Sequence, residues 1–381
     1  MRILLFKFCN NIRFLAPTSN RKETNGGNTE IDVVIQNLLK ENHQITVLTN
    51  KSYIEFAPKE ITVIPFEAFN LDTLKNYDLV LTFNSILNCF GGVVSNETLM
   101  SYRILNKAQE VGTHTIYAVT DTLLEIGDLS GWIRNAQKKE KYLELNPNEY
   151  EIDGSKILCL TQTHDLTLLP KIWKSKENQF KKYGYFPFEK TVFFRKRLEL
   201  DINSNHNGRV IYFGNPRGGK RDKNFNKFYC HLNVPVDVYG NWNQEKWAAK
   251  QKHVSSMPIF HGKKDMYELH KDINGSICHC YISDPQNENT IWTTRLYEAI
   301  LNRTLLFMDI KNDPQMKLFE DTYYYVKDSV ELDNKIHDLL SNPELRSQKI
   351  ERQFLIIMRK NHDLILNFSK VLDWSIKSLI G

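Results

Sequence analysis

Short apolar segments alternate with amphipathic ones along most of this chain, and the alternation occurs twice. The first series runs from residue 2 to residue 119, and the second runs from residue 210 to residue 326. Strand-like and helix-like segments that alternate in this way are typical of parallel sheets covered by helices on both faces. The sequence therefore predicts an α/β protein with two Rossmann-like domains.

The individual elements follow from the spacing of the apolar residues. In the first series, strands are expected at 2–8, 44–48, 61–65, 79–83 and 115–119, with helices near residue 28 and at 97–111. In the second, strands are expected at 210–213, 236–239, 276–282, 304–308 and 323–326, with helices at 222–230, 265–272 and 292–301.

The polar segment 200–208 separates the two series and is predicted to be a linker. The expected domains are therefore 1–200 and 201–360. Successive helices are expected from Leu332 onward, and the last of them, within 361–381, is predicted to cross back onto the first domain. A length of 381 residues fits two domains of this kind.

Composition narrows the class of protein only modestly. A net charge of +5 permits a nucleic-acid partner without requiring one. The six cysteines form no regular framework, which favours a reduced, cytoplasmic protein. Cys278-His279-Cys280 lacks a second ligand pair, so we interpret it as part of a buried strand and not as a zinc site. No segment reaches the length of a membrane span, and no membrane partner is expected.

The strongest local signal follows the expected strand at 210–213. Gly214 and Asn215 open a glycine-rich turn that carries Arg217 and leads into a helix with Arg221. Backbone N–H groups and a helix N-terminus attract phosphate, and arginine adds bidentate contacts. The turn nearly matches a P-loop, but Arg221 stands where a Ser or Thr would hold magnesium, which argues against an NTPase. Phosphate binding and a solvated basic turn both remain open.

A second signal is the segment 284–298, which begins where a strand ends and enters a helix. Arg295 and Glu298 are three residues apart on one helix face, and a surface ion pair would explain that spacing. In a nucleotide site, the same two side chains would supply a cation for a diphosphate and a carboxylate for ribose hydroxyls.

Two carboxylates of the first series are candidate functional groups. Asp121 lies just past the expected strand 115–119, where a carboxylate could accept a proton from an acceptor hydroxyl or simply cap a turn. Glu30 lies in the first turn of a helix, where it could also complement the helix dipole. The segment 171–197 is rich in lysine, arginine and aromatic residues, which suits either a DNA-backbone contact or a solvated face.

Taken in order, these segments resemble the DNA β-glucosyltransferase family of T-even phages. The segments that carry the resemblance are 10–11, 84–92, 119–121, 185–189 and the two segments of the second series described above. The resemblance implies the GT-B architecture, in which two facing Rossmann-like domains with parallel sheets enclose a deep interdomain cleft.

The resemblance also implies roles for individual residues. Asp121 matches the general base, and Glu30 matches a second catalytic carboxylate. The residues that match the nucleotide-sugar site are Gly214, Asn215, Arg217, Arg221, Asp284, Arg295 and Glu298, with the arginines on the diphosphate, Asp284 on the sugar and Glu298 on the ribose. The acceptor and DNA side is matched by Asn88, Phe90 and Glu189, and no protein ligand for a metal is expected.

The implied reaction is the transfer of glucose, with inversion, from UDP-glucose to the hydroxymethyl group of 5-hydroxymethylcytosine in duplex DNA, after base flipping. Mg²⁺ or Mn²⁺ would bind through the diphosphate. Such an enzyme would act as a monomer in the cytoplasm of a phage-infected bacterial cell, where the modification evades restriction. Asn287 stands where the family has an aromatic residue, so another UDP-sugar remains open. A hydroxymethyluracil or non-DNA acceptor, and a non-enzymatic nucleotide- or DNA-binding protein, also remain alternatives.

Overall fold

The computed structural model describes residues 1–14, 26–54, 57–84, 94–119, 128–162, 180, 182–195, 197–216, 219–249, 258–283, 288 and 291–380. They form two compact units. The first contains residues 1–14, 26–188 and 367–380, and the second contains residues 189–366. The units divide after Phe188, whereas the polar linker was predicted at 200–208.

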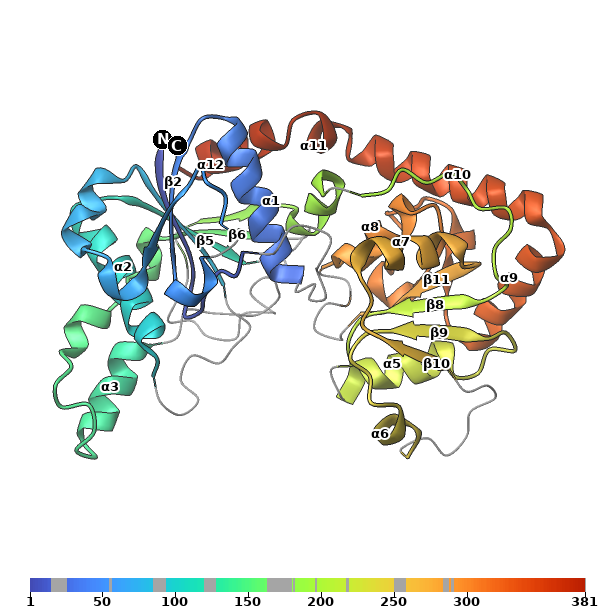
Figure 1. Ribbon diagram of the computed structural model, residues 1–381, viewed down its shortest axis with the longest axis horizontal. Coiled ribbons are helices and arrows are strands. Elements are labelled where there is room, and N and C mark those ends of the chain that lie inside the picture. The colour runs from blue at the N-terminus through green and yellow to red at the C-terminus, as the bar shows by residue number, and fades with distance from the viewer. Residues whose placement is uncertain are drawn as a thin grey trace. The chain divides into compact units, whose positions relative to one another are not determined.

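The first unit is built on a parallel sheet with the strand order β3-β2-β1-β4-β5-β6-β7 (Figure 1). Its strands are β1 (Arg2–Lys7), β2 (Gln44–Thr49), β3 (Thr62–Pro65), β4 (Leu79–Phe83), β5 (His114–Val119), β6 (Leu158–Thr161) and β7 (Lys182–Tyr185). Leu5 of β1 is opposite Val47 of β2 and Leu81 of β4. Because helices cover both faces of a sheet of this kind, β1 is apolar along most of its length instead of alternating.

The helices of the first unit are α1 (Gly26–Lys40), α2 (Asn96–Val111), α3 (Leu129–Gln137) and α12 (Phe368–Ile380). The side chain of Ser95 caps the start of α2, and Gly112, in the left-handed conformation, ends it. Tyr102 and Leu105 of α2 belong to a buried cluster that also contains Phe6 and Phe8. This helix therefore covers one face of the sheet.

The C-terminal helix α12 belongs to the first unit, where it contacts α1 and β7. It buries Phe368, Leu372 and Ile376, which recur at helical spacing. The ring of Phe368 lies 5.7 Å from that of Phe186 in an edge-to-face arrangement. A segment from the end of the sequence thus completes the core of the unit that the beginning of the sequence forms.

The second unit has a parallel sheet with the order β10-β9-β8-β11-β12-β13. Its strands are β8 (Val210–Phe213), β9 (Val236–Tyr239), β10 (Ile259–Gly262), β11 (Cys278–Tyr281), β12 (Leu305–Asp309) and β13 (Tyr325–Val326). The helices are α5 (Gly219–Tyr229), α6 (Gln244–Ala248), α7 (Met266–Gly275), α8 (Thr294–Leu301), α9 (Ser329–Ser341), α10 (Pro343–Lys360) and α11 (His362–Leu366).

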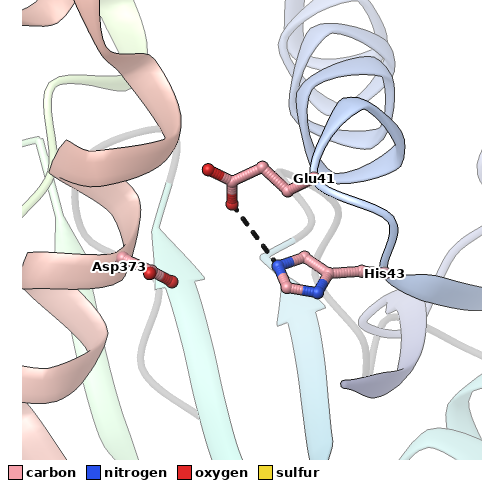
Figure 2. A group of neighbouring side chains, drawn as sticks. All are labelled: Glu41, His43 and Asp373. Atoms are coloured by element: carbon pink, nitrogen blue, oxygen red, sulfur yellow. Dashed lines mark ion pairs between the residues drawn. The ribbon is translucent and has the colours of Figure 1, made fainter.

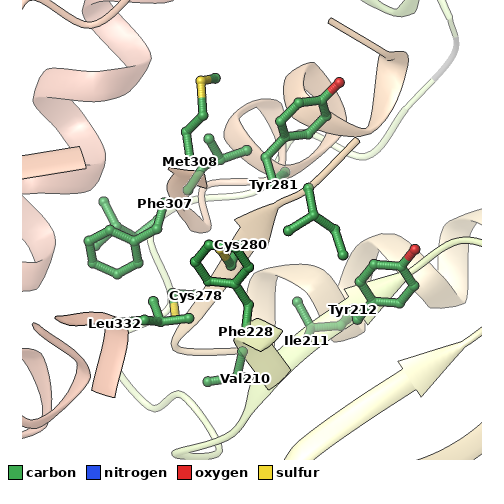
Figure 3. Packing of buried hydrophobic residues seen from close by; sticks show 14 of the residues in the cluster. Val210, Ile211, Tyr212, Phe228, Cys278, Cys280, Tyr281, Phe307, Met308 and Leu332 are labelled. Atoms are coloured by element: carbon green, nitrogen blue, oxygen red, sulfur yellow. The ribbon is translucent and has the colours of Figure 1, made fainter. Parts of the chain in front are cut away.

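The core of the second unit lies between these strands and helices. Figure 3 shows Cys278 and Cys280 of β11 among apolar side chains that include Phe228 of α5, Phe307 of β12 and Leu332 of α9. Burial raises the pKa of the Cys278 thiol to about 12. The Cys-His-Cys segment is therefore part of a buried strand, as predicted.

Arg346 of α10 ties the helical C-terminal part of this unit to its sheet. Its side chain is 1% exposed and is held entirely by backbone carbonyls. Nη1 donates to Asn203 O (2.8 Å), Nη2 donates to Ser276 O (2.9 Å) and Nε donates to Ile277 O (3.2 Å). One buried cation thereby satisfies two carbonyl groups where the chain enters β11 and a third in the segment before β8.

Most predicted elements are confirmed within a few residues. Strands β6 and β7 were not predicted, because lysine and aromatic residues obscure the alternation in that region. Strand β10 was also missed: it pairs only with β9, so it is an edge strand, and its short sequence ends in glycine.

Candidate functional site

Each sheet has a point where the strand order reverses, between β1 and β4 in the first unit and between β8 and β11 in the second. Ligands of open α/β sheets bind beyond the carboxyl ends of the strands at such points. Gly214 follows β8 directly, and α8 begins beyond the end of β11. The predicted nucleotide-sugar residues that the structure describes therefore gather at the switch point of the second sheet.

Gly214 is the most constrained residue of this site. Its φ angle of 149° is one that other residues rarely adopt, and a Cβ there would lie 2.8 Å from Arg295 Nη1. The adjoining loop approaches equally closely, since a Cβ at Gly240 would lie 2.4 Å from Gly214 O. Trp242 Nε1 donates to Gly214 O (2.7 Å), and the Asn241 amide donates to Asn215 Oδ1 (2.9 Å). The glycine turn is thus fixed by the neighbouring loop.

Arg295 and Arg221 bring positive charge to this turn. Arg295 Nη1 donates to Tyr212 Oη (3.1 Å), and Arg221, which is 6% exposed, has Nη1 3.4 Å from Asn215 O. Burial raises the pKa of Tyr281, while the charges of Arg295 and Arg221 both act to lower it. Both guanidinium groups therefore lie near one tyrosine hydroxyl, beside the N-termini of α5 and α8. Such an arrangement suits an anionic ligand with more than one phosphate.

Glu298 has a different partner from the one that its spacing suggested. Its Oε1 accepts from Arg195 Nη1 at 2.7 Å, and the two side chains are 16% and 8% exposed. The alternative of a surface ion pair between Arg295 and Glu298 is therefore not what the structure shows, because Glu298 pairs with Arg195 and Arg295 donates to Tyr212. Arg195 was grouped with the basic segment 171–197, and sequence spacing gave no sign of this contact.

Glu30 lies at the corresponding edge of the first sheet. The side chain is 6% exposed, and its charge acts on Lys7, which ends β1. Burial lowers the pKa of Lys7, and the carboxylate of Glu30 opposes that effect. The buried side chain of Asn84, directly after β4, lies at the same edge. The first unit thus also places polar side chains at its switch point.

Glu189 lies in a 3-10 helix (Phe188–Phe194) and belongs to the second unit. Its side chain is only 2% exposed, and its charge acts on the buried hydroxyl of Tyr297. The structure therefore groups this carboxylate with the residues around α8. An acceptor-side role for Glu189 stays a prediction.

Several predicted site residues lie outside the described residues. They are Asp121, Arg217, Asp284, Asn88 and Phe90, together with Asn287. Strand β5, which ends at Val119 just before Asp121, is described and lies between β4 and β6 in the sheet.

Within the described ranges, one group of possible metal ligands occurs, and it lies in the first unit: Glu41, His43 and Asp373 (Figure 2). His43 Nε2 is 3.4 Å from Glu41 Oε2, and Asp373 also pairs with Lys377 at 3.4 Å. His43 precedes β2, so the group lies at the amino ends of the strands, at the edge opposite the switch point. We interpret it as a polar contact between α12 and the sheet.

His279 of β11 is not a metal ligand candidate either. Its Nδ1 lies 2.9 Å from Ile211 O, and burial lowers its pKa to about 3. The imidazole is therefore a neutral core group.

Among the helices that the structure describes, none has the length and apolar character needed to cross a membrane.

Comparison with known proteins agrees with this geometry. No protein-family profile matches the chain. A curated relative, the DNA beta-glucosyltransferase of Enterobacteria phage T4, is 22% identical over 291 residues, which cover 76% of this chain and 81% of the relative. This chain is similar to a phage DNA beta-glucosyltransferase. The resemblance predicted from the sequence is confirmed.

Solved structures extend the similarity to the fold. The T4 beta-glucosyltransferase with UDP and Mn²⁺ matches with a TM-score of 0.77 at 18% identity, over 99% of both chains. HepE from Anabaena with UDP matches with a TM-score of 0.58 at 13% identity, over 100% of both chains. An alpha-glucosyltransferase with UDP-glucose and DNA that contains an abasic site matches with a TM-score of 0.54 at 12% identity, over 96% of this chain and 99% of the other. The predicted fold class, GT-B with two parallel-sheet α/β domains, is confirmed.

Proposed function

We propose that this protein is an inverting glycosyltransferase that moves glucose from UDP-glucose to a hydroxymethylated pyrimidine, 5-hydroxymethylcytosine, in duplex DNA. The observation that carries the proposal is the glycine turn at Gly214. Arg295 lies against this turn, and Arg221 contacts Asn215 beside it. Similarity to the T4 DNA beta-glucosyltransferase over 76% of the chain supports glucose as the transferred sugar and DNA as the acceptor, and the similar T4 structure with UDP-glucose supports that donor.

The second unit would bind the nucleotide sugar. Arg295 and Arg221, with Arg217, would hold the diphosphate, and their charge would stabilise the leaving group as its negative charge grows. Glu298 would accept hydrogen bonds from the ribose hydroxyls, and Asp284 would contact the sugar.

The first unit would bind the acceptor, with Asn88 and Phe90 on the DNA side. A base must leave the stack before its substituent can reach an active site. Asp121 would then accept the proton of the hydroxymethyl group while the hydroxyl oxygen of that group attacks the anomeric carbon of the glucose. The bond from that carbon to the diphosphate oxygen breaks as the new glycosidic bond forms, which inverts the configuration. Glu30, held near Lys7, would be the second carboxylate of this site.

A divalent cation would enter as part of the donor substrate. The described donor-site residues are a glycine turn and two arginines, which suit a diphosphate and not a bare cation. Mg²⁺ or Mn²⁺ would therefore arrive bound to the diphosphate. We further propose that the protein acts as a monomer in the cytoplasm of the infected cell.

The test is transfer of label from radioactive UDP-glucose, with magnesium, to duplex DNA that contains 5-hydroxymethylcytosine, with unmodified DNA as the control. We expect label only in the modified duplex, and its loss in Asp121→Asn. Asp128→Asn is the matched control, because Asp128 caps α3 through the Gly131 amide at 2.7 Å and should affect stability alone. Label in hydroxymethyluracil DNA, or from another UDP-sugar, would replace the stated acceptor or donor. Tight UDP binding without transfer to any DNA would overturn the DNA acceptor.

A further inference from the structure

Arg195 has two side-chain nitrogens that no residue in the described part of the chain engages. Its side chain is 8% exposed, and Nη1 is engaged by Glu298 Oε1 at 2.7 Å. Nε and Nη2 are also buried, but neither has a hydrogen-bond partner in the part of the chain that the structure describes. Buried donors on a charged group are costly to leave unpaired, so these two nitrogens have donors to offer to a ligand.

His270 of α7 shows the same feature beside this pair. It is 5% exposed, and its Nδ1 has no hydrogen-bond partner among the described residues. Burial lowers the pKa of His270. The negative charge of Glu298 opposes this lowering, and the positive charge of Arg195 adds to it. The three side chains therefore form one buried polar cluster, supplied by α7, by α8 and by the segment before β8.

This cluster, here named the Arg195 cluster (Arg195, His270 and Glu298), offers donors and acceptors together. The carboxylate accepts hydrogen bonds, and the guanidinium donates them. A hydroxyl group donates and accepts at once, so a vicinal diol can bind the carboxylate and the guanidinium together. A carboxylate alone could accept only the hydroxyl protons, and its buried charge would lack a counter-ion.

The cluster also lies at a suitable place. Glu298 is one helical turn beyond Arg295 on α8, a rise of about 4.5 Å, and Arg295 lies against the Gly214 turn. In a nucleoside diphosphate, the ribose is bonded directly to the first phosphate. A ribose that extends from a diphosphate on Arg295 would therefore bring its hydroxyl groups toward Glu298 and Arg195.

We propose that Arg195 binds the ribose diol together with Glu298 and selects ribonucleoside over deoxyribonucleoside diphosphates. This inference rests on the proposed nucleotide site. It adds Arg195 to that site, together with a selectivity for ribose over deoxyribose. A 2′-deoxyribose lacks one of the two hydroxyls, so donors of Arg195 stay buried and unpaired when it binds.

Isothermal titration of the full chain with UDP and with 2′-deoxy-UDP tests this selectivity. We expect the unmodified protein to prefer UDP by about 100-fold, because a site built around a hydroxyl rejects an analogue that lacks it. Arg195→Met should weaken UDP binding by about 30-fold and 2′-deoxy-UDP binding by less than about 3-fold, so that the preference for UDP becomes much smaller. Arg195→Lys keeps the charge but not the planar fork, so its preference for UDP should lie between those of the unmodified protein and Arg195→Met.

Arg303→Met is the matched control. Arg303 follows α8 at its other end and pairs with Glu351 at 2.8 Å, so its loss should lower stability without changing the ratio of the two affinities. If Arg195→Met weakened both ligands equally, Arg195 would be structural and the inference would be wrong. If the unmodified protein bound neither ligand, the proposed nucleotide site would fail as well. A folded Arg195→Lys variant, checked by thermal unfolding, keeps the test decisive if the methionine variant does not fold.

Discussion

A β-carbon at position 214 would lie 2.8 Å from Nη1 of Arg295, so the arginine occupies space that only a glycine leaves free. Gly214 also has a φ angle of 149°. Both the contact with Arg295 and the φ angle therefore require glycine at position 214, and Arg295 belongs to the proposed diphosphate site.

Gly214→Ala should therefore displace Arg295 and strain the turn. We expect UDP binding to weaken at least about tenfold and the free energy of unfolding to fall by about 1–3 kcal/mol. Calorimetry and urea unfolding measure the two effects. Gly262→Ala is the control, because Gly262 has a φ angle of 73° and no atom within 4 Å of an added Cβ. It should cost stability alone, and equal losses of UDP affinity in the two variants would contradict the prediction.

Tyr212→Phe should weaken nucleotide binding without disturbing the fold. The Tyr212 hydroxyl accepts the hydrogen bond that orients Arg295 at 3.1 Å. Removing one such bond should reduce UDP affinity by about 3- to 10-fold. Tyr324→Phe removes another buried hydroxyl, which donates to Lys349 O at 3.0 Å, and should leave UDP affinity unchanged. A greater loss of affinity in the Tyr324 variant would refute the assignment.

Asp237 of β9 should make stability depend on pH. Burial alone would raise its pKa, but hydrogen bonds from Arg209 Nε (2.6 Å) and His261 Nε2 (2.8 Å) outweigh burial and hold the pKa below its usual value. A carboxyl group whose pKa is lower in the folded state contributes stability above its unfolded pKa and loses it as pH falls through the folded pKa. Asp237→Asn should thus cost about 2 kcal/mol at neutral pH.

The difference in free energy of unfolding between the unmodified protein and Asp237→Asn should become smaller as pH falls below 3.8, the ordinary pKa of an aspartate. Urea unfolding of both proteins at neutral pH and near pH 3 measures this change. A gap that stays constant over that range would show that the carboxylate charge is not what stabilises the fold.

Arg346→Met should be strongly destabilising, because three backbone carbonyls would lose their donor. At about 1 kcal/mol or more for each carbonyl, we expect the free energy of unfolding to fall by at least about 3 kcal/mol. Arg359→Met is a suitable comparison on the same helix, since the Arg359 side chain is 72% exposed and lies 3.9 Å from Glu320. That change should stay within about 0.5 kcal/mol in the same unfolding measurement. Similar losses in the two variants would be incompatible with this role for Arg346.

The sequence was most informative about elements that depend on local patterns of residues. Apolar runs predicted β1, β4, β8 and β9, because strands buried on both faces need apolar residues throughout. The glycine turn after β8 was likewise predicted, since Gly214 and Arg221 lie close together in the chain.

Contacts between distant segments could not be predicted in this way. Arg195 and Glu298 are 103 residues apart, and only the packing of the segment before β8 against α8 brings them together. The nearby Arg295 offered an obvious local partner for Glu298, which is why the spacing alone suggested that pair as an alternative. Strand β7 was missed because its lysine and tyrosine residues hide a four-residue strand in a basic segment.

The return of residues 367–380 to the first unit has a consequence for synthesis of the chain. Residues 189–366 of the second unit are all synthesised before Phe368, Leu372 and Ile376, which the first unit needs on its sheet. Domains generally fold in order from the N-terminus. Here the unit that begins the chain cannot complete its core until α12 has been synthesised, after the whole of the second unit.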